Sequence, residues 1–279
     1  IVNGLVGSEM CIRDRSSLMK NKKGLVMGVA NQKSIAWGIA EVLSSEGASL
    51  ALTYQGDSFK KRVEPLAKSI GSNLIFDVDV TDENSIEQCF NELSKEWGSL
   101  DFVVHALAFS DKSELSGRFI NTSRQNFLNS LDISCFSLID ISKRCSPLMN
   151  PGGAILTLSY LGSQRVTPNY NVMGVAKAAL ESSVRYLASD LGEDGIRVNA
   201  ISAGPMKTLA GAAIGGARRV FRISEQNSPL KSNPTLKSVG GTAAFLLSDY
   251  GMHVSGEVIF VDGGYHVMGM PKLDDTEKV

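Results

Sequence analysis

Tyr170 and Lys177 are the two residues whose types and spacing point most directly to chemistry. They are seven residues apart, and on a regular helix this spacing places both side chains on one face, within about 20°. An ammonium group lowers the pKa of a nearby phenol and can also hydrogen-bond a sugar hydroxyl. Such a phenol is a good donor toward an oxygen that gains negative charge. The simpler alternative is an amphipathic helix that carries one Tyr and one Lys.

The position of this pair in the chain favours the functional interpretation. The apolar run at 154–159 is typical of a strand, Tyr160 follows it directly, and a helix is expected to begin near Tyr170. Ligands of open α/β sheets bind at the carboxyl ends of the strands. We therefore expect Tyr160, Tyr170 and Lys177 to lie at a binding edge.

Short apolar runs alternate with helical patterns along the chain, and the first four begin 24 to 27 residues apart. Most of them are apolar without strict alternation, as expected for a parallel sheet that is covered on both faces. The pattern predicts an α/β fold, a Rossmann-like doubly wound seven-stranded parallel sheet with helices on both faces. The predicted strands are 24–30, 49–54, 73–79, 100–106, 154–159, 197–202 and 257–262.

Three of the intervening segments show clear helical periodicity. The first carries Ile35 and Ile39 and ends at Gly47, and the second follows the cap-like Asp82 and ends at Gly98. The third is an apolar stripe from Phe127 through Leu131, Ser134, Leu138 and Ile141 to Cys145. We expect all three stripes to pack in the core.

Length and composition predict one domain. The chain has 279 residues, of which 43% are hydrophobic, so it can bury a substantial core. We assign residues 20–270 to a single Rossmann-like domain, 1–19 to a disordered or artefactual leader, and 271–279 to a polar tail.

Charge and cysteine usage exclude several partners. The net charge is −1, which provides no overall field for nucleic acid or an anionic membrane, and no apolar run reaches the ~18 residues of a membrane helix. The four cysteines form no CxxC pair and the three histidines are scattered, so neither a metal site nor a disulfide framework is predicted. We expect a cytoplasmic protein with reduced cysteines.

The segment that joins the first strand to the first helix can bind a phosphate group. Gly28 allows a tight turn, Gly38 allows close packing of the helix on the sheet, and Ser34 can cap the helix or donate to a pyrophosphate. The spacing is not G-x-G-x-x-G, so an ordinary turn is the alternative, although the position in the first βαβ unit favours a nucleotide site.

The ends of the second and third strands carry further candidates. Gln55 stands where a ribose-binding carboxylate is usual, so the residues do not decide between NAD and NADP. Lys60 and Lys61 either approach a 2′-phosphate or form a solvated helix face. Asp79 either contacts an adenine ring or caps the following helix.

Several motifs in order resemble those of the short-chain dehydrogenases/reductases, and specifically the enoyl-acyl-carrier-protein reductases of type II fatty acid synthesis. The usual Tyr-x3-Lys pair is absent, and Tyr170-x6-Lys177 is similar to the pair of that divergent branch. The resemblance covers about residues 23–270, with one departure at 105–108, where the family often has Ser and Gly at 106 and 108. The motifs are GVANQKSIAWGIA at 28–40, LTLSYLG at 156–162, PNYNVMGVAKAALE at 168–181, RVNAISAGPMKTLA at 197–210 and SGEVIFVDGG at 255–264.

The resemblance implies a role for each matching residue. Lys177 would bind the nicotinamide ribose, Tyr170 would hydrogen-bond the thioester carbonyl, and Tyr160 would border the substrate. Ser110 would lie near the substrate. The remaining cofactor contacts would come from Gly28, Ser34, Ile35, Gln55, Asp79, Val80, Leu107, Met206, Lys207, Thr208, Leu209 and Ala210.

The resemblance also implies the reaction, its cofactor and its partners. The chain would reduce the double bond of trans-2-enoyl-acyl-carrier-protein thioesters with NADH or NADPH, in the last step of the fatty acid elongation cycle. Acyl carrier protein would be its partner, and the family's usual state is a homotetramer. The alternatives are a carbonyl reductase of the same fold and a catalytically silent nucleotide sensor.

Residues 208–228 are rich in small residues and then become basic and aromatic. Gly211, Gly215 and Gly216 each weaken a helix by about 1 kcal/mol relative to Ala, which predicts a mobile flap over the acyl chain. Arg218, Arg219 and Arg222 either receive the acidic carrier protein or form a solvated basic face.

Overall fold

All seven predicted strands are present in one parallel sheet. The computed structural model describes residues 17–209, 211 and 215–270. The strand order is β3-β2-β1-β4-β5-β6-β7, so the order reverses beside β1. The strands are β1 (Lys23–Met27), β2 (Ser49–Tyr54), β3 (Leu74–Asp77), β4 (Leu100–His105), β5 (Met149–Ser159), β6 (Arg197–Ala203) and β7 (Val258–Val261).

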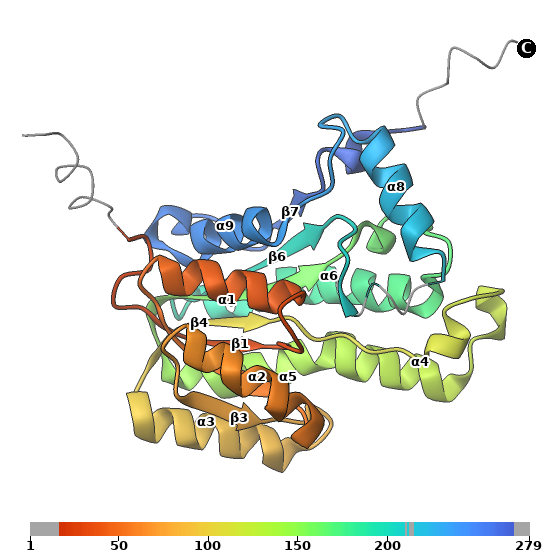
Figure 1. Cartoon of the computed structure of the whole chain (residues 1–279). Coiled ribbons are helices and arrows are strands. Elements are labelled where there is room, and N and C mark those ends of the chain that lie inside the picture. Colours follow the sequence, from red (N-terminus) through yellow and green to blue (C-terminus); the bar gives the residue numbers. More distant parts are fainter. Residues whose placement is uncertain (1–16, 210, 212–214, 271–279) are drawn as a thin grey trace, which may run out of the picture.

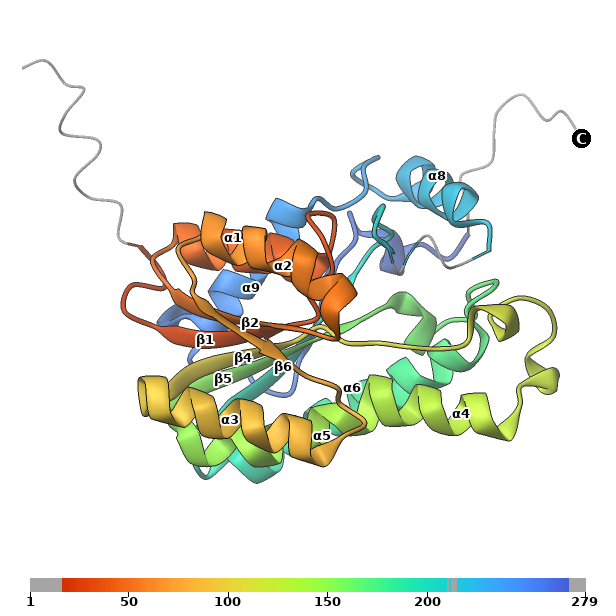
Figure 2. The same cartoon turned by 60° about the horizontal axis from the view of Figure 1, so that its bottom comes forward.

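Helices cover both faces of this sheet, which confirms the predicted Rossmann-like doubly wound architecture (Figure 2). One face carries α1 (Ile35–Ser45), α2 (Asp57–Ser69) and α9 (Leu236–Leu247). The other carries α3 (Glu83–Trp97), α5 (Ser137–Cys145) and α6 (Asn171–Gly192). α4 (Arg124–Leu131) and α8 (Ala217–Asn227) extend beyond the carboxyl edge of the sheet (Figure 1). Short 3-10 turns lie at Lys112–Glu114, Phe119–Asn121, Ser146–Leu148, Leu161–Ser163, Asp249–Gly251 and Tyr265–Val267.

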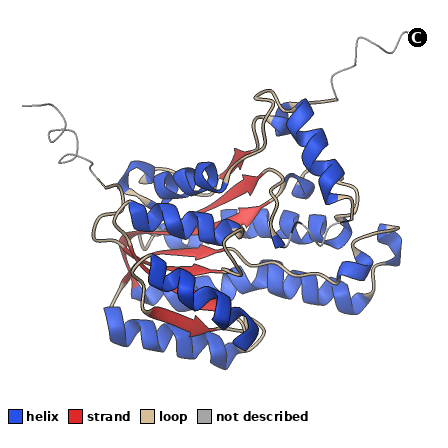
Figure 3. Ribbon diagram, viewed as in Figure 1, coloured by secondary structure: helices blue, strands red, loops and turns tan. Residues whose placement is uncertain are grey.

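Because the strands are parallel, their carboxyl ends meet at one edge, which the arrowheads mark in Figure 3. The predicted site residues follow these ends: Gly28 after β1, Gln55 after β2, Asp79 after β3, Leu107 after β4 and Tyr160 after β5. The fold therefore brings the predicted nucleotide and catalytic residues to the same edge.

The third predicted helix differs from its expected form. It is interrupted by a π-helical turn at Asp132–Phe136, and such turns are frequent at functional sites. Phe127 and Leu131 are only half-buried, whereas the polar Asn126 and Ser130 face inward. The apolar stripe is therefore buried only from Ser134 onward, where Leu138, Ile141 and Cys145 join the core.

Gly38 serves a different contact from the one expected. A Cβ atom at Gly38 would lie 2.5 Å from the Cβ of Leu236, and one at Gly240 would lie 2.7 Å from the Gly38 carbonyl oxygen. Gly38 belongs to α1, and Leu236 and Gly240 belong to α9. The glycine therefore permits close approach of two helices rather than of a helix and the sheet.

The sequence predicts that the domain starts at residue 20. In the structure, the packed part of the chain begins earlier. Met19 is fully buried in the core beside α1, and its amide donates to the Glu46 carbonyl oxygen at 3.0 Å. The rest of the predicted leader, 1–16, and the predicted tail, 271–279, lie outside the described residues. Among the described helices, none has the length and apolar character needed to cross a membrane.

Candidate active site

Tyr170 lies in a tight turn immediately before α6. Asn169 and Asn171 on either side have φ values of 59° and 35°, in the left-handed region that Asn tolerates better than most residues. The Asn169 side chain donates to the Gly215 carbonyl oxygen at 2.8 Å, and the Asn171 side chain donates to the Glu114 carbonyl oxygen at 3.0 Å. Loops from two other parts of the chain therefore fix the turn that presents Tyr170.

Tyr160 and Tyr170 lie side by side, as their predicted roles require. Their ring centroids are 5.0 Å apart and the rings meet edge to face at 68°. Tyr170 is buried in a cluster with Leu115 and Met173. Sequence reasoning did not identify Leu115 and Met173 as neighbours of Tyr170. Met173 is three residues after Tyr170 on α6, a spacing that could have revealed it. A Cβ atom at Gly162 would lie 2.4 Å from the Tyr170 ring, so this glycine makes room for the phenol.

The pKa of Tyr170 is raised above its ordinary value, contrary to the expected lowering by Lys177. Burial is the main cause, and the neighbouring Tyr160 and the Glu181 carboxylate add to it. Burial likewise raises the pKa of Tyr160 to about 12. Both phenols therefore keep their protons at neutral pH and are hydrogen-bond donors.

Lys177 is a buried cation at the end of β5. Its Nζ donates to the Leu158 carbonyl oxygen at 2.7 Å, and the side chain is only 5% exposed. Burial lowers its pKa from 10.5 to about 8, against the opposing effects of Cys135 and Glu181. Within the described part of the chain no second acceptor bonds to Nζ, so two of its three N–H donors are available to a ligand.

Glu181 is a second buried charge, which sequence reasoning did not single out. It is only 5% exposed, and its carboxylate accepts hydrogen bonds from Ser159, Ser163 and Gln164. Its spacing of four residues from Lys177 places both on one helix face, a signal that could have found it.

The turn after β1 is shaped by a close backbone contact. Gly28 has φ 93°, and a Cβ atom there would lie 2.1 Å from the Ala106 carbonyl oxygen and 3.3 Å from Leu107. Gly28 and Leu107 are thus brought together as predicted residues of the cofactor edge.

The N-terminus of α1 fits a phosphate group. The Ser34 hydroxyl accepts hydrogen bonds from the Ala30 and Asn31 amides at 3.0 Å each, so it braces the loop. It does not cap the helix that begins at Ile35. The first-turn amides of α1 therefore have no side-chain cap and remain available to an anion.

At the ends of β2 and β3, Gln55 and Asp79 lie within hydrogen-bonding reach of each other. Burial by itself would raise the pKa of Asp79. Hydrogen bonds from Thr81 and Gln55 nevertheless hold this pKa below its usual value. Asp79 does not cap α3, because Asp82 accepts from the Asn84 amide at 3.0 Å and caps that helix instead.

The two lysines of α2 lie on its solvent-exposed side. Lys60 lies over the Tyr54 ring, 5.9 Å from its centroid, and both Lys60 and Lys61 are solvent-exposed. A solvated helix face describes them better than a phosphate contact.

The segment after β6 leads from the sheet to α8. The Thr208 hydroxyl accepts from the Gly211 amide at 2.9 Å, and Lys207 Nζ lies 4.7 Å from the Phe221 ring centroid. Met206 is half-buried and Leu209 is exposed. The predicted contact at Ala210 lies outside the described residues, and the mobility of the flap remains a prediction.

Ser110 lies in the loop after β4 and is tied to α4. Its hydroxyl donates to the Asn126 side-chain oxygen at 3.2 Å, and the Asp111 amide donates to the same oxygen at 2.9 Å. The contact fixes the loop, while the substrate role of Ser110 stays a prediction.

His105, at the end of β4, is a buried histidine with two partners. Its ring nitrogens lie 3.0 Å from the Thr157 hydroxyl and 2.8 Å from the Ser137 hydroxyl. Burial lowers its pKa to about 3, so the ring is neutral. It joins β4 and β5 to α5 beneath the site.

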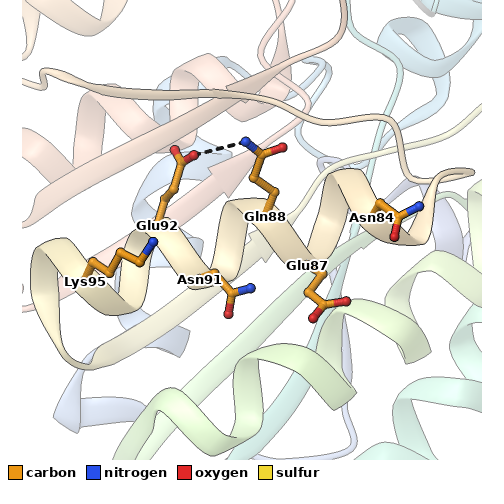
Figure 4. A pocket seen from close by; sticks show the side chains of 6 residues that line it. All are labelled: Asn84, Glu87, Gln88, Asn91, Glu92 and Lys95. Atoms are coloured by element: carbon orange, nitrogen blue, oxygen red, sulfur yellow. Dashed lines mark hydrogen bonds between the residues drawn. The ribbon is translucent and has the colours of Figure 1, made fainter.

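A surface depression runs along α3 and shares no residue with this site (Figure 4). Polar side chains line it, and Gln88 donates to Glu92 at 3.3 Å. Within the described residues no cluster of His, Cys, Asp and Glu side chains could hold a metal ion.

The chain is similar to a family of known proteins. A family described as enoyl-(acyl carrier protein) reductase matches residues 28–266. The chain is 56% identical over 259 residues to enoyl-(acyl-carrier-protein) reductase (NADH) 1 of Rhizobium meliloti strain 1021, covering 93% of this chain and 95% of that relative.

Two solved structures are closely similar. The reductase from Anaplasma phagocytophilum in complex with NAD has a TM-score of 0.88 at 54% identity, covering 92% of this chain and 96% of that one. FabI from Candidatus Liberibacter asiaticus has a TM-score of 0.90 at 51% identity, covering 91% and 99% of the two chains.

Proposed function

The chain belongs to the enoyl-(acyl carrier protein) reductase family, and we propose that Tyr160, Tyr170 and Lys177 carry out its reaction. It is an oxidoreductase that reduces the carbon–carbon double bond of trans-2-enoyl thioesters on acyl carrier protein, the last step of the fatty acid elongation cycle. NADH supplies the hydride when it is bound. The observation that carries the assignment is the buried, protonated Tyr170 beside Tyr160.

Tyr170 stabilises the charge that the reaction creates. Addition of hydride to the β-carbon moves negative charge onto the thioester oxygen. A phenol with a raised pKa keeps its proton and donates a hydrogen bond to that oxygen in a site shielded from water. Tyr160 borders the substrate beside Tyr170.

Lys177 and the loops at the carboxyl edge hold the cofactor. The two available N–H donors of Lys177 fit the hydroxyls of the nicotinamide ribose. The uncapped α1 N-terminus at Ile35, with Gly28 and Ser34, fits the diphosphate. The adenosine is assigned to Gln55, Asp79 and Val80, and the nicotinamide end to Leu107 and 206–210.

The test is oxidation of NADH in the presence of a short trans-2-enoyl thioester. Tyr170→Phe and Lys177→Met are each expected to lower kcat at least tenfold, since each loses a group that touches substrate or cofactor. Tyr250→Phe is the matched control, because Tyr250 is 73% exposed in the turn at Asp249–Gly251 and takes no part in the proposed site. Intact turnover in both site variants would show that the assignment is wrong. Turnover of ketones in place of enoyl thioesters would favour the carbonyl reductase.

The basic face of α8 receives the carrier protein in this proposal. Arg218, Arg219 and Arg222 are all exposed there, beyond the carboxyl edge of the sheet. Reversing their charges should raise KM for the carrier-linked substrate more than for the coenzyme A thioester. Lys95→Glu on α3 is the control, and equal effects on both substrates would argue against docking.

Self-association into a homotetramer completes the proposal. Large apolar side chains remain exposed on α4, α5, α6 and the π-turn, and β7 is an apolar strand at the edge of the sheet. Exposed apolar patches of this kind are typical of interfaces. Sedimentation should give four chains, and Leu128→Glu with Ile139→Glu should lower that number. The exposed residues are Leu128, Phe136, Ile139, Val175 and Tyr186.

A cytoplasmic location is supported by the described cysteines. Cys89, Cys135 and Cys145 are free and buried, and burial raises the pKa of Cys89 and Cys145 to about 12. Free thiols are usual in a reducing compartment. Cell fractionation tests the location.

A further inference from the structure

Glu181 has a buried carboxylate that the reaction described above does not use. Its Oε1 accepts hydrogen bonds from the Ser159 hydroxyl at 2.5 Å and from the Ser163 hydroxyl at 2.6 Å. Its Oε2 accepts one from the side-chain Nε2 of Gln164 at 3.3 Å. A buried carboxylate is costly unless it is hydrogen-bonded in this way, so its presence here calls for a physical reason.

The three donors come from the segment that carries Tyr160. Ser159 ends β5, Tyr160 follows it, and Ser163 and Gln164 form the end of the next turn. Glu181 thus ties both sides of Tyr160 to α6, the helix that follows Tyr170.

This turn is packed against α6 without spare room. A Cβ atom at Gly174 would lie 2.8 Å from the Gly162 carbonyl oxygen, and one at Gly162 would lie 2.4 Å from the Tyr170 ring. Movement of the turn would therefore change the position of both tyrosines.

Glu181 also acts on Lys177 through its charge. The two residues are four apart on α6, and the carboxylate raises the pKa of Lys177 against the lowering caused by burial. Cys135 from the π-turn, the neutral His105 from β4 and the protonated Tyr170 also face this region. Glu181 is the nearby carboxylate that affects both Lys177 and Tyr170.

We infer that Glu181 is a positioning residue of the reductase site, which clamps the Tyr160-bearing turn onto α6 and places a carboxylate about one helical turn from Lys177. The inference rests on the proposed roles of Tyr160 and Lys177. It separates into two parts, a clamp and a charge, and each part has its own measurement.

Glu181→Gln tests the charge, because it keeps the size of the side chain. NADH affinity is measured by fluorescence titration across pH, without turnover. Loss of the carboxylate should move the alkaline weakening of NADH binding to lower pH, because a charge that raises the pKa of Lys177 is removed. The loss of affinity relative to the wild type should therefore be clearest around pH 8, where Lys177 titrates. The same titration in a Cys135→Ser background removes the contribution of that thiol.

Ser163→Ala tests the clamp, because it removes one hydrogen bond and leaves the charge. It should lower kcat about three- to tenfold while the pH dependence of NADH binding stays as in the wild type. Asp190→Asn is the matched control, an exposed carboxylate on the same helix that should change neither measurement.

An unchanged pH dependence of NADH binding in folded Glu181→Gln would overturn the proposed effect of the Glu181 charge on Lys177. An unchanged kcat in Ser163→Ala would overturn the proposed clamp on the Tyr160-bearing turn. If Glu181→Gln does not fold, Glu181→Asp decides, since it keeps the charge and shortens the reach. It should lower kcat and leave the pH dependence in place, and a shift of the pH dependence would overturn the inference. Failure of the proposed function is distinguishable, because wild-type protein would then bind NADH without reducing the enoyl thioester.

Discussion

Replacing Gly28 by Ala tests whether the turn after β1 is shaped by contact with β4. Two costs are expected. At φ 93°, the presence of a Cβ atom costs about 1–2 kcal/mol of conformational free energy. That atom would also lie 2.1 Å from the Ala106 carbonyl oxygen, so it must move by at least 1.3 Å to reach 3.4 Å, where ordinary contact begins. Overpacking of this kind costs about 1–3 kcal/mol.

The free energy of unfolding should therefore fall by about 2–5 kcal/mol in Gly28→Ala. Gly71→Ala is the matched control, because Gly71 has φ 73° with nothing within 4 Å of its Cβ position and should show only the first cost. Urea unfolding monitored by circular dichroism measures both. The dissociation constant for NADH should rise at least tenfold in Gly28→Ala, as the turn and Leu107 move, and stay unchanged in Gly71→Ala. Equal losses of stability in the two variants, with unchanged NADH affinity, would refute the reasoning.

Three further outcomes follow from the site and the core. The value of kcat/KM should decline as the pH rises through about 8, because the Lys177 ammonium loses its proton there. Lys177→Arg should move this decline to higher pH. A profile that stays flat to about pH 10 would contradict the prediction. Gly162→Ala should lower kcat at least tenfold by displacing the Tyr170 ring, whereas Gly241→Ala, with open space around it, should not, and steady-state assays of both variants check this. Met19→Ala should lower the free energy of unfolding by about 2–4 kcal/mol, while Met252→Ala, at an exposed position, should change it by less than about 0.5 kcal/mol, as measured by urea unfolding.

The sheet could be predicted from sequence because its strands are buried on both faces. Uninterrupted apolar runs such as 49–54 and 100–106 then carry the signal by themselves. Two strand boundaries differ from the prediction: β1 ends at Met27 because Gly28 turns the chain, and β5 begins at Met149, before its apolar part.

The polar interior could not be predicted in the same way. Asn126 and Ser130 resemble a solvent-facing stripe in sequence, yet they are buried because each finds hydrogen-bond partners in the fold. The π-turn at Asp132–Phe136 then shifts the register of the following apolar residues.

In the candidate site, the spacing of Tyr170 and Lys177 was visible but the sign of the tyrosine pKa change was not. Spacing reports which groups share a helix face, while desolvation depends on side chains from distant segments, such as Leu115. Burial, together with Tyr160 and Glu181, therefore raises the pKa of Tyr170, whereas the spacing alone predicted a lowering by Lys177.

The close contact between α1 and α9 has a consequence for folding during synthesis. Gly38 touches Leu236, 198 residues later in the chain. At about 5–20 residues per second, a ribosome needs about 10–40 s to add that length. During this interval α1 has no α9 to cover its outer apolar residues. The nascent chain therefore exposes this surface until α9 has emerged, and chaperone binding should be strongest in that interval.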